Sequence, residues 1–144
     1  MNAKKKIPLM LLRLALGWMM LYAGLSKILA PQWTSKGYMA GAKILPEFFN
    51  WLALPNIMPI TDFLNQWGLT LIGLSLLLGF FVRISSVFGL ALMILYYLPL
   101  IDPALFPKIE HSYVVDEHII YALVFLVLAV FNAGKAWGID SYRK

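Results

Sequence analysis

The stretch "GLTLIGLSLLLGFFVRISSVFGLALMILYYL", residues 68–98, contains a single charged residue, Arg83. A helix that crosses a membrane needs about 20 mostly apolar residues. Two such helices fit around this stretch, at about residues 62–82 and 84–101, with "VRISS", residues 82–86, as the link between them. So short a link predicts that the two helices form an antiparallel hairpin.

Two further apolar runs lie outside this hairpin, at about residues 7–29 and 117–133. Of the 144 residues, 61% are hydrophobic and 13% are charged, whereas a soluble domain carries roughly 25% charged residues. We therefore expect an all-α integral membrane protein, with residues 1–144 forming a single domain built as a four-transmembrane-helix bundle. Nucleic acid is not an expected partner, because the basic residues flank apolar runs.

The segment between the first two expected helices, residues 31–61, is rich in aromatic residues and contains four prolines. Proline interrupts helices, and aromatic rings are typical of the headgroup layer of a membrane. We expect an amphipathic segment with one or two short helices across the outer mouth of the bundle. It is either an apolar connector or a lid over a site, and the sequence favours neither.

The distribution of lysine and arginine predicts the orientation in the membrane. Four lie on one side: Lys27, Lys36, Lys43 and Lys108. Seven lie on the other side: Lys4, Lys5, Lys6, Arg83, Lys135, Arg143 and Lys144. The side richer in positive charge normally faces the cytoplasm, so both termini are expected there.

Small residues mark the expected contacts between helices, because they let two backbones approach closely. The first span offers Gly17 and Gly24 on one face. The second and third offer a larger set: Gly68, Ser75, Gly79, Ser85, Ser86 and Gly89.

Ionisable groups at membrane depth are functional candidates, because charge in hydrocarbon is costly. Arg13 is expected to extend toward the inner headgroups. Lys27 lies on the face of Gly17 and Gly24 and is expected to point into the bundle. At the same outer level, the last span begins with Asp116, Glu117 and His118. A cation and two carboxylates at one depth predict an outward-facing polar site.

The same acidic residues have a simpler interpretation, which the sequence supports equally well. Asp116 at the N-cap and Glu117 in the first turn would satisfy free N–H groups and suit the helix dipole. A metal site made of His111, Glu117 and His118 is less favoured, because their spacing matches no known ligand pattern. The chain has no cysteine, so neither an iron–sulfur cluster nor a c-type haem is expected. The two histidines lie near one end of one span, which argues against a bis-histidine haem.

Three stretches together are similar to a known family: "RLALGWMMLYAGLSKIL" (13–29), "GLSLLLGFFVRISS" (73–86) and "DEHIIYALVFLVLAVFNAGKAWGID" (116–140). They resemble the DoxX-like family, and within it the DoxD-type membrane subunit of thiosulfate:quinone oxidoreductase. The resemblance implies four spans in the cytoplasmic membrane of a bacterium or archaeon. It also implies electron transfer from thiosulfate to a membrane quinone, with tetrathionate as product and a second subunit as partner.

The residues at membrane depth suggest which side chains would take part in such a reaction. Lys27, Glu117 and His118 are the candidate catalytic residues. Lys27 would either hold an anionic substrate such as thiosulfate or stabilise a reduced quinone oxyanion, and His118 or Glu117 would relay protons from outside. The candidates for a quinone slot are Trp18, Tyr22, Tyr121 and Phe125. The alternatives are a non-enzymatic anchor or scaffold for a redox partner in the lipid bilayer, and a small transporter. The transporter would require a homo-oligomer, because four spans are few.

Overall fold

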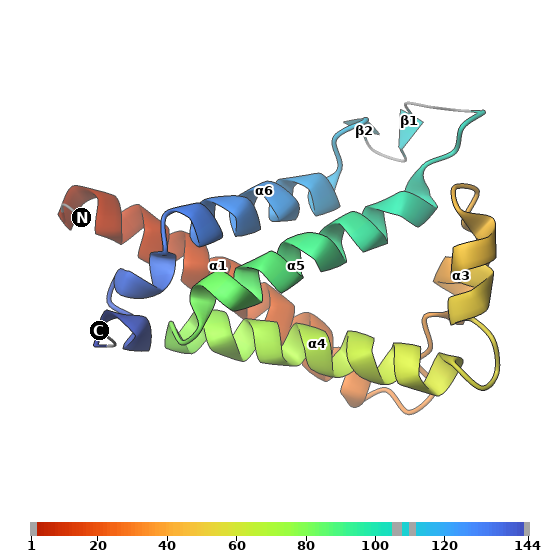
Figure 1. Cartoon of the computed structure of the whole chain (residues 1–144), viewed down its shortest axis with the longest axis horizontal. Coiled ribbons are helices and arrows are strands. Elements are labelled where there is room, and N and C mark those ends of the chain that lie inside the picture. Colours follow the sequence, from red (N-terminus) through yellow and green to blue (C-terminus); the bar gives the residue numbers. More distant parts are fainter. Residues whose placement is uncertain (1–2, 105–107, 110–111, 143–144) are drawn as a thin grey trace.

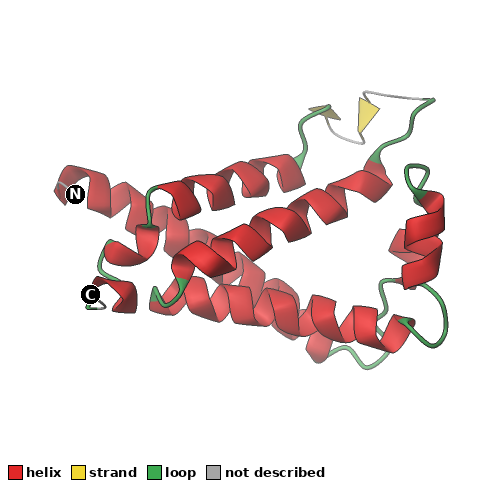
Figure 2. Ribbon diagram, viewed as in Figure 1, coloured by secondary structure: helices red, strands yellow, loops and turns green. Residues whose placement is uncertain are grey.

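The computed structural model describes residues 3–104, 108–109 and 112–142, which are almost entirely helical (Figure 1, Figure 2). The α-helices in these residues are α1 (Ala3–Ile28), α2 (Lys36–Ala40), α3 (Pro46–Leu52), α4 (Met58–Leu78), α5 (Val82–Tyr97) and α6 (Glu117–Val130). Short 3₁₀ helices follow α5 and α6: η1 (Leu98–Leu100), η2 (Ala133–Lys135) and η3 (Ile139–Ser141). Two-residue strands β1 (Lys108–Ile109) and β2 (Ser112–Tyr113) pair antiparallel, with Lys108 opposite Tyr113.

The four long helices pack as two pairs, α1 against α4 and α5 against α6 (Figure 1). A tight turn joins α4 to α5 at one end of the molecule, and the two helices diverge toward the other end, where α3 lies. Both termini lie at the end of the tight turn. The predicted antiparallel hairpin is therefore present, but it is open at one end.

Two of the described helical segments are long and apolar enough to cross a membrane. They are Lys4–Ile28 and the continuous run Val82–Leu100, which joins α5 to η1. Helix α4 has 21 residues, but Asp62, Asn65 and Gln66 make its first half polar. Helix α6 is strongly apolar but has only 14 residues. Length and composition thus identify two candidate spans among the four helices that the sequence predicts.

The α1–α4 interface is a close approach of two backbones, made possible by glycine. A Cβ atom on Gly17 would lie 2.9 Å from the Cβ of Leu76, and one on Gly73 would lie 2.3 Å from the backbone nitrogen of Leu21. A Cβ on Gly24 would lie 2.3 Å from Thr70 Oγ1. The predicted roles of Gly17 and Gly24 are therefore confirmed.

The predicted packing role of Gly68 is wrong, because a Cβ atom there would meet nothing within 4 Å. Gly73, five residues later, lies in the α1 interface instead. Helix α1 crosses α4 on the face of Gly73, and 3.6 residues per turn place Gly68 on another face.

The turn of the hairpin also differs from its prediction. Residues 82–86 are the first turn of α5, and the link is the stretch 79–81. Gly79 ends α4 in the left-handed conformation at φ 68°, which glycine adopts without steric cost. The carboxylate of Asp140 then accepts hydrogen bonds from the backbone nitrogens of Phe81 and Val82, each at 3.0 Å. A distant acidic side chain therefore begins α5.

Arg13 does not extend toward headgroups as predicted, because its side chain is buried in the protein with 2% exposure. Its Nη1 atom donates to the carbonyl of Ala133 at 3.1 Å, and the nearby Asp140 carboxylate offsets its charge. Gly79 and Gly138 leave the space that the guanidinium occupies. Arg13 thus links α1 to the C-terminal segment.

The segment of residues 31–61 forms two short helices, α2 and α3, as predicted. Met39 from α2 and Phe49 from α3 are buried against the ends of α4 and α5. The backbone nitrogen and Oγ of Ser35 donate to Asp62 at 2.9 and 2.6 Å. The hydroxyl of Tyr38 donates to the carbonyl of Tyr96. These contacts hold the two helices over the open end of the hairpin, and we refer to α2 and α3 together as the cap.

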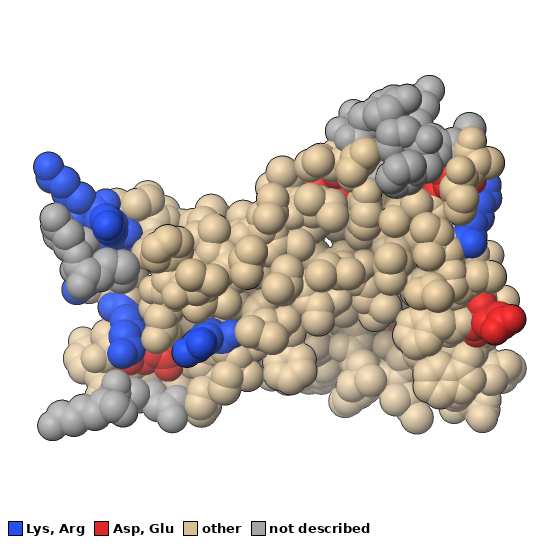
Figure 3. Space-filling model, turned by 45° about the horizontal axis from the view of Figure 1, so that its top comes forward, with Lys and Arg blue, Asp and Glu red and all other residues tan. Residues whose placement is uncertain are grey.

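Charged side chains gather at the two ends of the molecule (Figure 3). Between these ends, the face drawn in Figure 3 is mostly uncharged. An uncharged face between two charged ends is typical of a protein surrounded by lipid.

Candidate functional site

A cavity of about 250 Å³ lies between α1, α4, α5 and α6. Its lining contains the three predicted catalytic residues, Lys27, Glu117 and His118. The other lining residues are Met19, Met20, Ala23, Leu69, Met93, Tyr96 and Tyr121. We call it the charged cavity. The first and last long helices thus bring a cation, a carboxylate and an imidazole to one place.

Lys27 reaches this cavity from the last turn of α1 and is half-buried. Its ammonium donates to the carbonyl of Ala23 at 3.2 Å and lies 5.4 Å from the centroid of the Trp33 ring. A cation over the face of an indole is attracted by the ring's electrons. Among the described residues, no carboxylate forms an ion pair with Lys27. Within the described residues, the contacts of the ammonium are thus a backbone carbonyl and an aromatic ring.

The carboxylate of Asp116 makes two contacts at the start of α6. Its Oδ1 accepts from the backbone nitrogen of Ile119 at 3.1 Å, which confirms the predicted N-cap. Its Oδ2 lies 2.6 Å from Nδ1 of His118. A carboxylate at Nδ1 fixes the orientation of the imidazole and leaves Nε2 to exchange protons. Glu117, next to it, is exposed at the mouth of the cavity.

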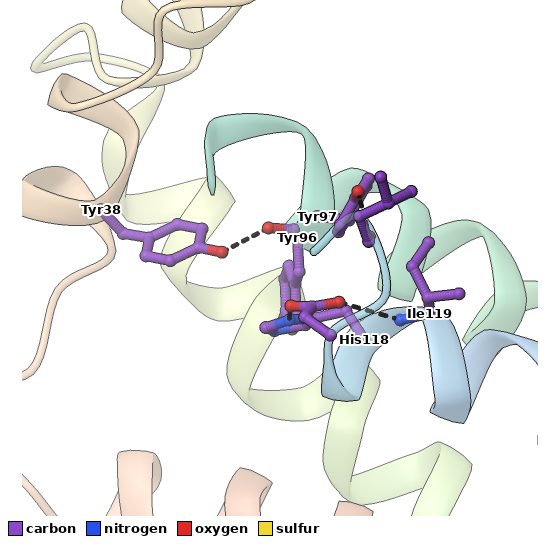
Figure 4. A network of polar contacts seen from close by, with 7 residues as sticks. Tyr38, Tyr96, Tyr97, His118 and Ile119 are labelled. Carbon is purple, nitrogen blue, oxygen red and sulfur yellow. Dashed lines mark hydrogen bonds and ion pairs between the residues drawn. The ribbon is translucent and has the colours of Figure 1, made fainter. Parts of the chain in front are cut away.

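Tyr96, which the sequence analysis did not select, stands beside His118. Its ring meets the imidazole edge-on, with centroids 6.0 Å apart and planes at 85°. In Figure 4 the two side chains lie next to each other where α5 and α6 meet, and Tyr38 reaches toward them from the cap. A tyrosine near the end of an apolar run was the available signal, because aromatic hydroxyls at that depth need a partner.

Tyr38 connects the cap to this end of the bundle. Burial, together with the negative charges of Asp116 and Glu117, raises the pKa of Tyr38 to about 12. Its hydroxyl therefore stays protonated at physiological pH and can donate to the carbonyl of Tyr96.

The four residues predicted to form a quinone slot are not brought together. Tyr121 lines the charged cavity. Phe125 is fully buried and packs on Gly89, where a Cβ atom would lie 2.4 Å from its ring. Trp18 and Tyr22 point away from the bundle, with exposures of 62% and 67%.

The alternative metal site cannot be traced in full, since His111 lies outside the described residues. Within those residues, no three side chains of histidine, aspartate or glutamate form a group able to hold a metal ion.

The curated proteins and the solved structures contain no match to this chain. The sequence model of the DoxX family, in contrast, matches residues 8–98, which is more than half of the chain. This range contains most of α1, the cap, α4 and α5, and therefore Lys27 and Tyr96, whereas α6 follows it. With this match and its two candidate spans, the chain belongs to the DoxX family of membrane proteins.

Proposed function

We propose that this chain is a DoxD-like membrane subunit of a thiosulfate:quinone oxidoreductase. In this proposal α1, α4, α5 and α6 all cross the cytoplasmic membrane of a bacterium or archaeon, with both termini in the cytoplasm. The excess of lysine and arginine at the end that holds the termini supports this orientation. The short helix α6 is accommodated by local thinning of the bilayer. The charged cavity then opens to the outside.

One observation carries the proposal: the ammonium of Lys27 and the Asp116–His118 pair line or adjoin the same cavity. Thiosulfate carries two negative charges, and Lys27 has no carboxylate partner among the described residues. In a partly buried site, the attraction between a cation and an anion is stronger than in water.

In the proposed reaction, the residues of the charged cavity have different roles. Lys27 binds and orients thiosulfate. Two thiosulfate ions each give up one electron and join through a new S–S bond, which yields tetrathionate. A bound quinone supplies the acceptor for these two electrons and for two protons. His118, held by Asp116, moves protons at Nε2, and the exposed Glu117 exchanges them with water outside.

The test is thiosulfate-dependent reduction of a soluble quinone by the purified protein, together with any subunit that co-purifies. Lys27→Gln should raise the KM for thiosulfate at least about tenfold, because it removes a charged hydrogen-bond donor. His118→Gln should lower kcat by about 10²-fold or more, as expected for loss of a general acid or base. Lys36→Gln is the matched control, since Lys36 is exposed on α2 outside the cavity; it should leave both constants unchanged.

Activity that survives both Lys27→Gln and His118→Gln would contradict this assignment of the site. A protein that shows no thiosulfate-dependent reduction and no bound quinone after solvent extraction would instead favour a non-enzymatic anchor for a redox partner.

A further inference from the structure

Helices α4 and α5 leave an apolar groove between them as they diverge from the tight turn (Figure 1). Its volume is about 620 Å³, and its walls include Leu71 on α4 and Ile84 and Phe88 on α5. These three side chains are 60%, 54% and 66% exposed. Among the described residues, the groove shares no lining residue with the charged cavity. It is therefore a separate site, and its bulky apolar walls are accessible from outside the protein.

The polar groups in the groove already interact within the protein. The Oγ atoms of Ser75 and Ser85 lie 2.7 Å apart. The hydroxyl of Ser85 also lies 3.1 Å from the carbonyl oxygen of Val82. Within the described part of the chain, no charged side chain lines the groove. Because a polar group taken from water into such a place would lose hydrogen bonds, the groove favours hydrocarbon.

The dimensions of the groove distinguish between a hydrocarbon chain and a helix. Its lining runs from Leu64 to Ser75 along α4 and from Phe81 to Leu92 along α5. A helix rises 1.5 Å per residue, so each stretch is about 16 Å long. A volume of about 620 Å³ over this length gives a mean cross-section of about 40 Å². A helix with its side chains is about 10–12 Å across, or roughly 80–110 Å². The groove is therefore narrower than a helix and is better matched by a single hydrocarbon chain.

Positive charge is concentrated at the end of the groove that adjoins the tight turn. Phe80 and Phe81 line the groove there, and the exposed Arg83 follows two residues later. Other exposed cations at this end of the molecule are Lys4, Lys5 and Lys135 (Figure 3). The acidic side chain described at this end, Asp140, accepts hydrogen bonds from the backbone nitrogens of Phe81 and Val82. Clustered lysine and arginine at a membrane surface attract anionic lipid headgroups.

We propose that this groove binds one acyl chain of an anionic phospholipid, whose headgroup lies among these cations. The second acyl chain would remain in the surrounding bilayer. The narrow apolar groove favours a hydrocarbon chain, and the charge at its end favours a negative headgroup over a zwitterionic one. The inference uses the membrane location of the family and requires neither thiosulfate nor quinone, so it is independent of the proposed function.

Lipid binding can be measured on the purified, delipidated protein in detergent. The protein is titrated with dioleoylphosphatidylglycerol or with dioleoylphosphatidylcholine, and native mass spectrometry gives the Kd of each complex. The wild type should bind the anionic lipid at least about tenfold more tightly, as expected for two or more cations near one headgroup.

Two substitutions on α4 test the groove, and one serves as their control. Gly68→Trp and Leu71→Trp should each weaken the binding of both lipids about tenfold, because the indole would occupy the space of the acyl chain. A Cβ atom at Gly68 meets nothing within 4 Å, so the fold accommodates a side chain there. Leu74→Trp is the matched control, since Leu74 is exposed on the same helix but does not line the groove. It should bind both lipids like the wild type.

A separate pair of substitutions tests the headgroup. Arg83→Gln should reduce the preference for the anionic lipid about fivefold, as expected for the loss of one cation, and should leave the Kd of the zwitterionic lipid unchanged. Lys36→Gln removes an exposed positive charge at the cap instead, so it should change neither Kd.

Equal Kd values of the two lipids in the wild type would overturn the proposal. Unchanged binding in Gly68→Trp and Leu71→Trp proteins that keep the circular dichroism of the wild type would also overturn it. A dimer that lipid does not dissociate, but that Gly68→Trp does, would assign the groove to a second copy of the chain and refute the lipid site. Selective lipid binding without thiosulfate-dependent reduction refutes the proposed function alone. Thiosulfate-dependent reduction by a protein without lipid preference refutes this site alone.

Discussion

Arg13 shows at the scale of one residue how a charge in the first helix can stabilise the protein. Its guanidinium is buried and donates a hydrogen bond to the carbonyl of Ala133, which comes 120 residues later in the sequence. A buried charge costs free energy unless it is paired and hydrogen-bonded. Gly79 and Gly138 have no side chains, and this leaves the space that the guanidinium of Arg13 occupies.

Arg13→Met should lower the free energy of unfolding by about 1–3 kcal/mol, because it leaves the Ala133 carbonyl without its hydrogen-bond donor and removes a positive charge near Asp140. The measurement is reversible unfolding of the purified protein by SDS in mixed micelles. Arg83→Met serves as control, since Arg83 is exposed at the same end of the bundle, and a change within about 0.5 kcal/mol is expected there. Equal effects of the two substitutions would show that Arg13 has no special structural role.

The residues that the sequence predicted well are those that act locally. Asp116 could be recognised as an N-cap because its partner, Ile119, lies three residues away. Lys27 could be predicted to point into the bundle because it shares a helix face with Gly24. The contact between Tyr96 and His118 could not be predicted, because it depends on how two helices rotate and cross, which short-range patterns do not determine.

At the scale of elements, the α1–α4 interface holds the α1 side chains that line the charged cavity. The interface rests on glycines that bring the two backbones together, and Gly73 lies against the backbone of Leu21. A shift of α1 outward would move Lys27 away from the start of α6. The geometry of the charged cavity therefore depends on this interface.

Two glycines of the same helix provide a matched comparison. Gly73→Ala should destabilise the protein by about 1–3 kcal/mol, because its Cβ would overlap α1. Gly68→Ala should be neutral or stabilise it by up to about 1 kcal/mol, since alanine favours the helix and the Cβ meets open space. SDS unfolding of both variants, with circular dichroism of the folded state, checks this. A Gly73→Ala protein as stable as the Gly68→Ala protein would contradict the interface described here.

The positions of the helices were largely predictable, whereas their ends were not. Long apolar runs and the prolines of the cap located α1, α4, α5, α6 and the short helices between them. The hairpin turn was misplaced by three residues at its start, where Gly79 was an available local signal for the end of α4. The group that begins α5 was not predictable, because it is Asp140, 59 residues from Phe81. No local pattern around residues 79–81 contains that information.

At the scale of the whole molecule, the distribution of charged residues and the arrangement of the helices distinguish the same two ends. Basic side chains surround the end that holds both termini, and the cap covers the opposite end (Figure 1, Figure 3). In a membrane the two ends would face opposite compartments. The orientation proposed here puts the cap and the charged cavity outside.

Introduced cysteines can test this orientation, because the chain has no cysteine of its own. Asn50→Cys on α3 and Ile139→Cys on η3 both replace neutral, exposed residues, so the charge count is unchanged. A membrane-impermeant maleimide applied to intact spheroplasts should label position 50 and spare position 139. After permeabilisation both should react, which controls for accessibility. The reverse pattern would refute the proposed orientation.

The bond from Asp140 to the start of α5 has a consequence for how the protein is made. Residues 79–97 are synthesised before residue 140, so a hairpin that crosses the membrane as proposed would first form without that carboxylate. Water would solvate the backbone nitrogens of Phe81 and Val82 in the meantime. In the proposed topology, biogenesis would therefore have two stages, in which the helices insert first and the last segment then folds back to complete the hairpin.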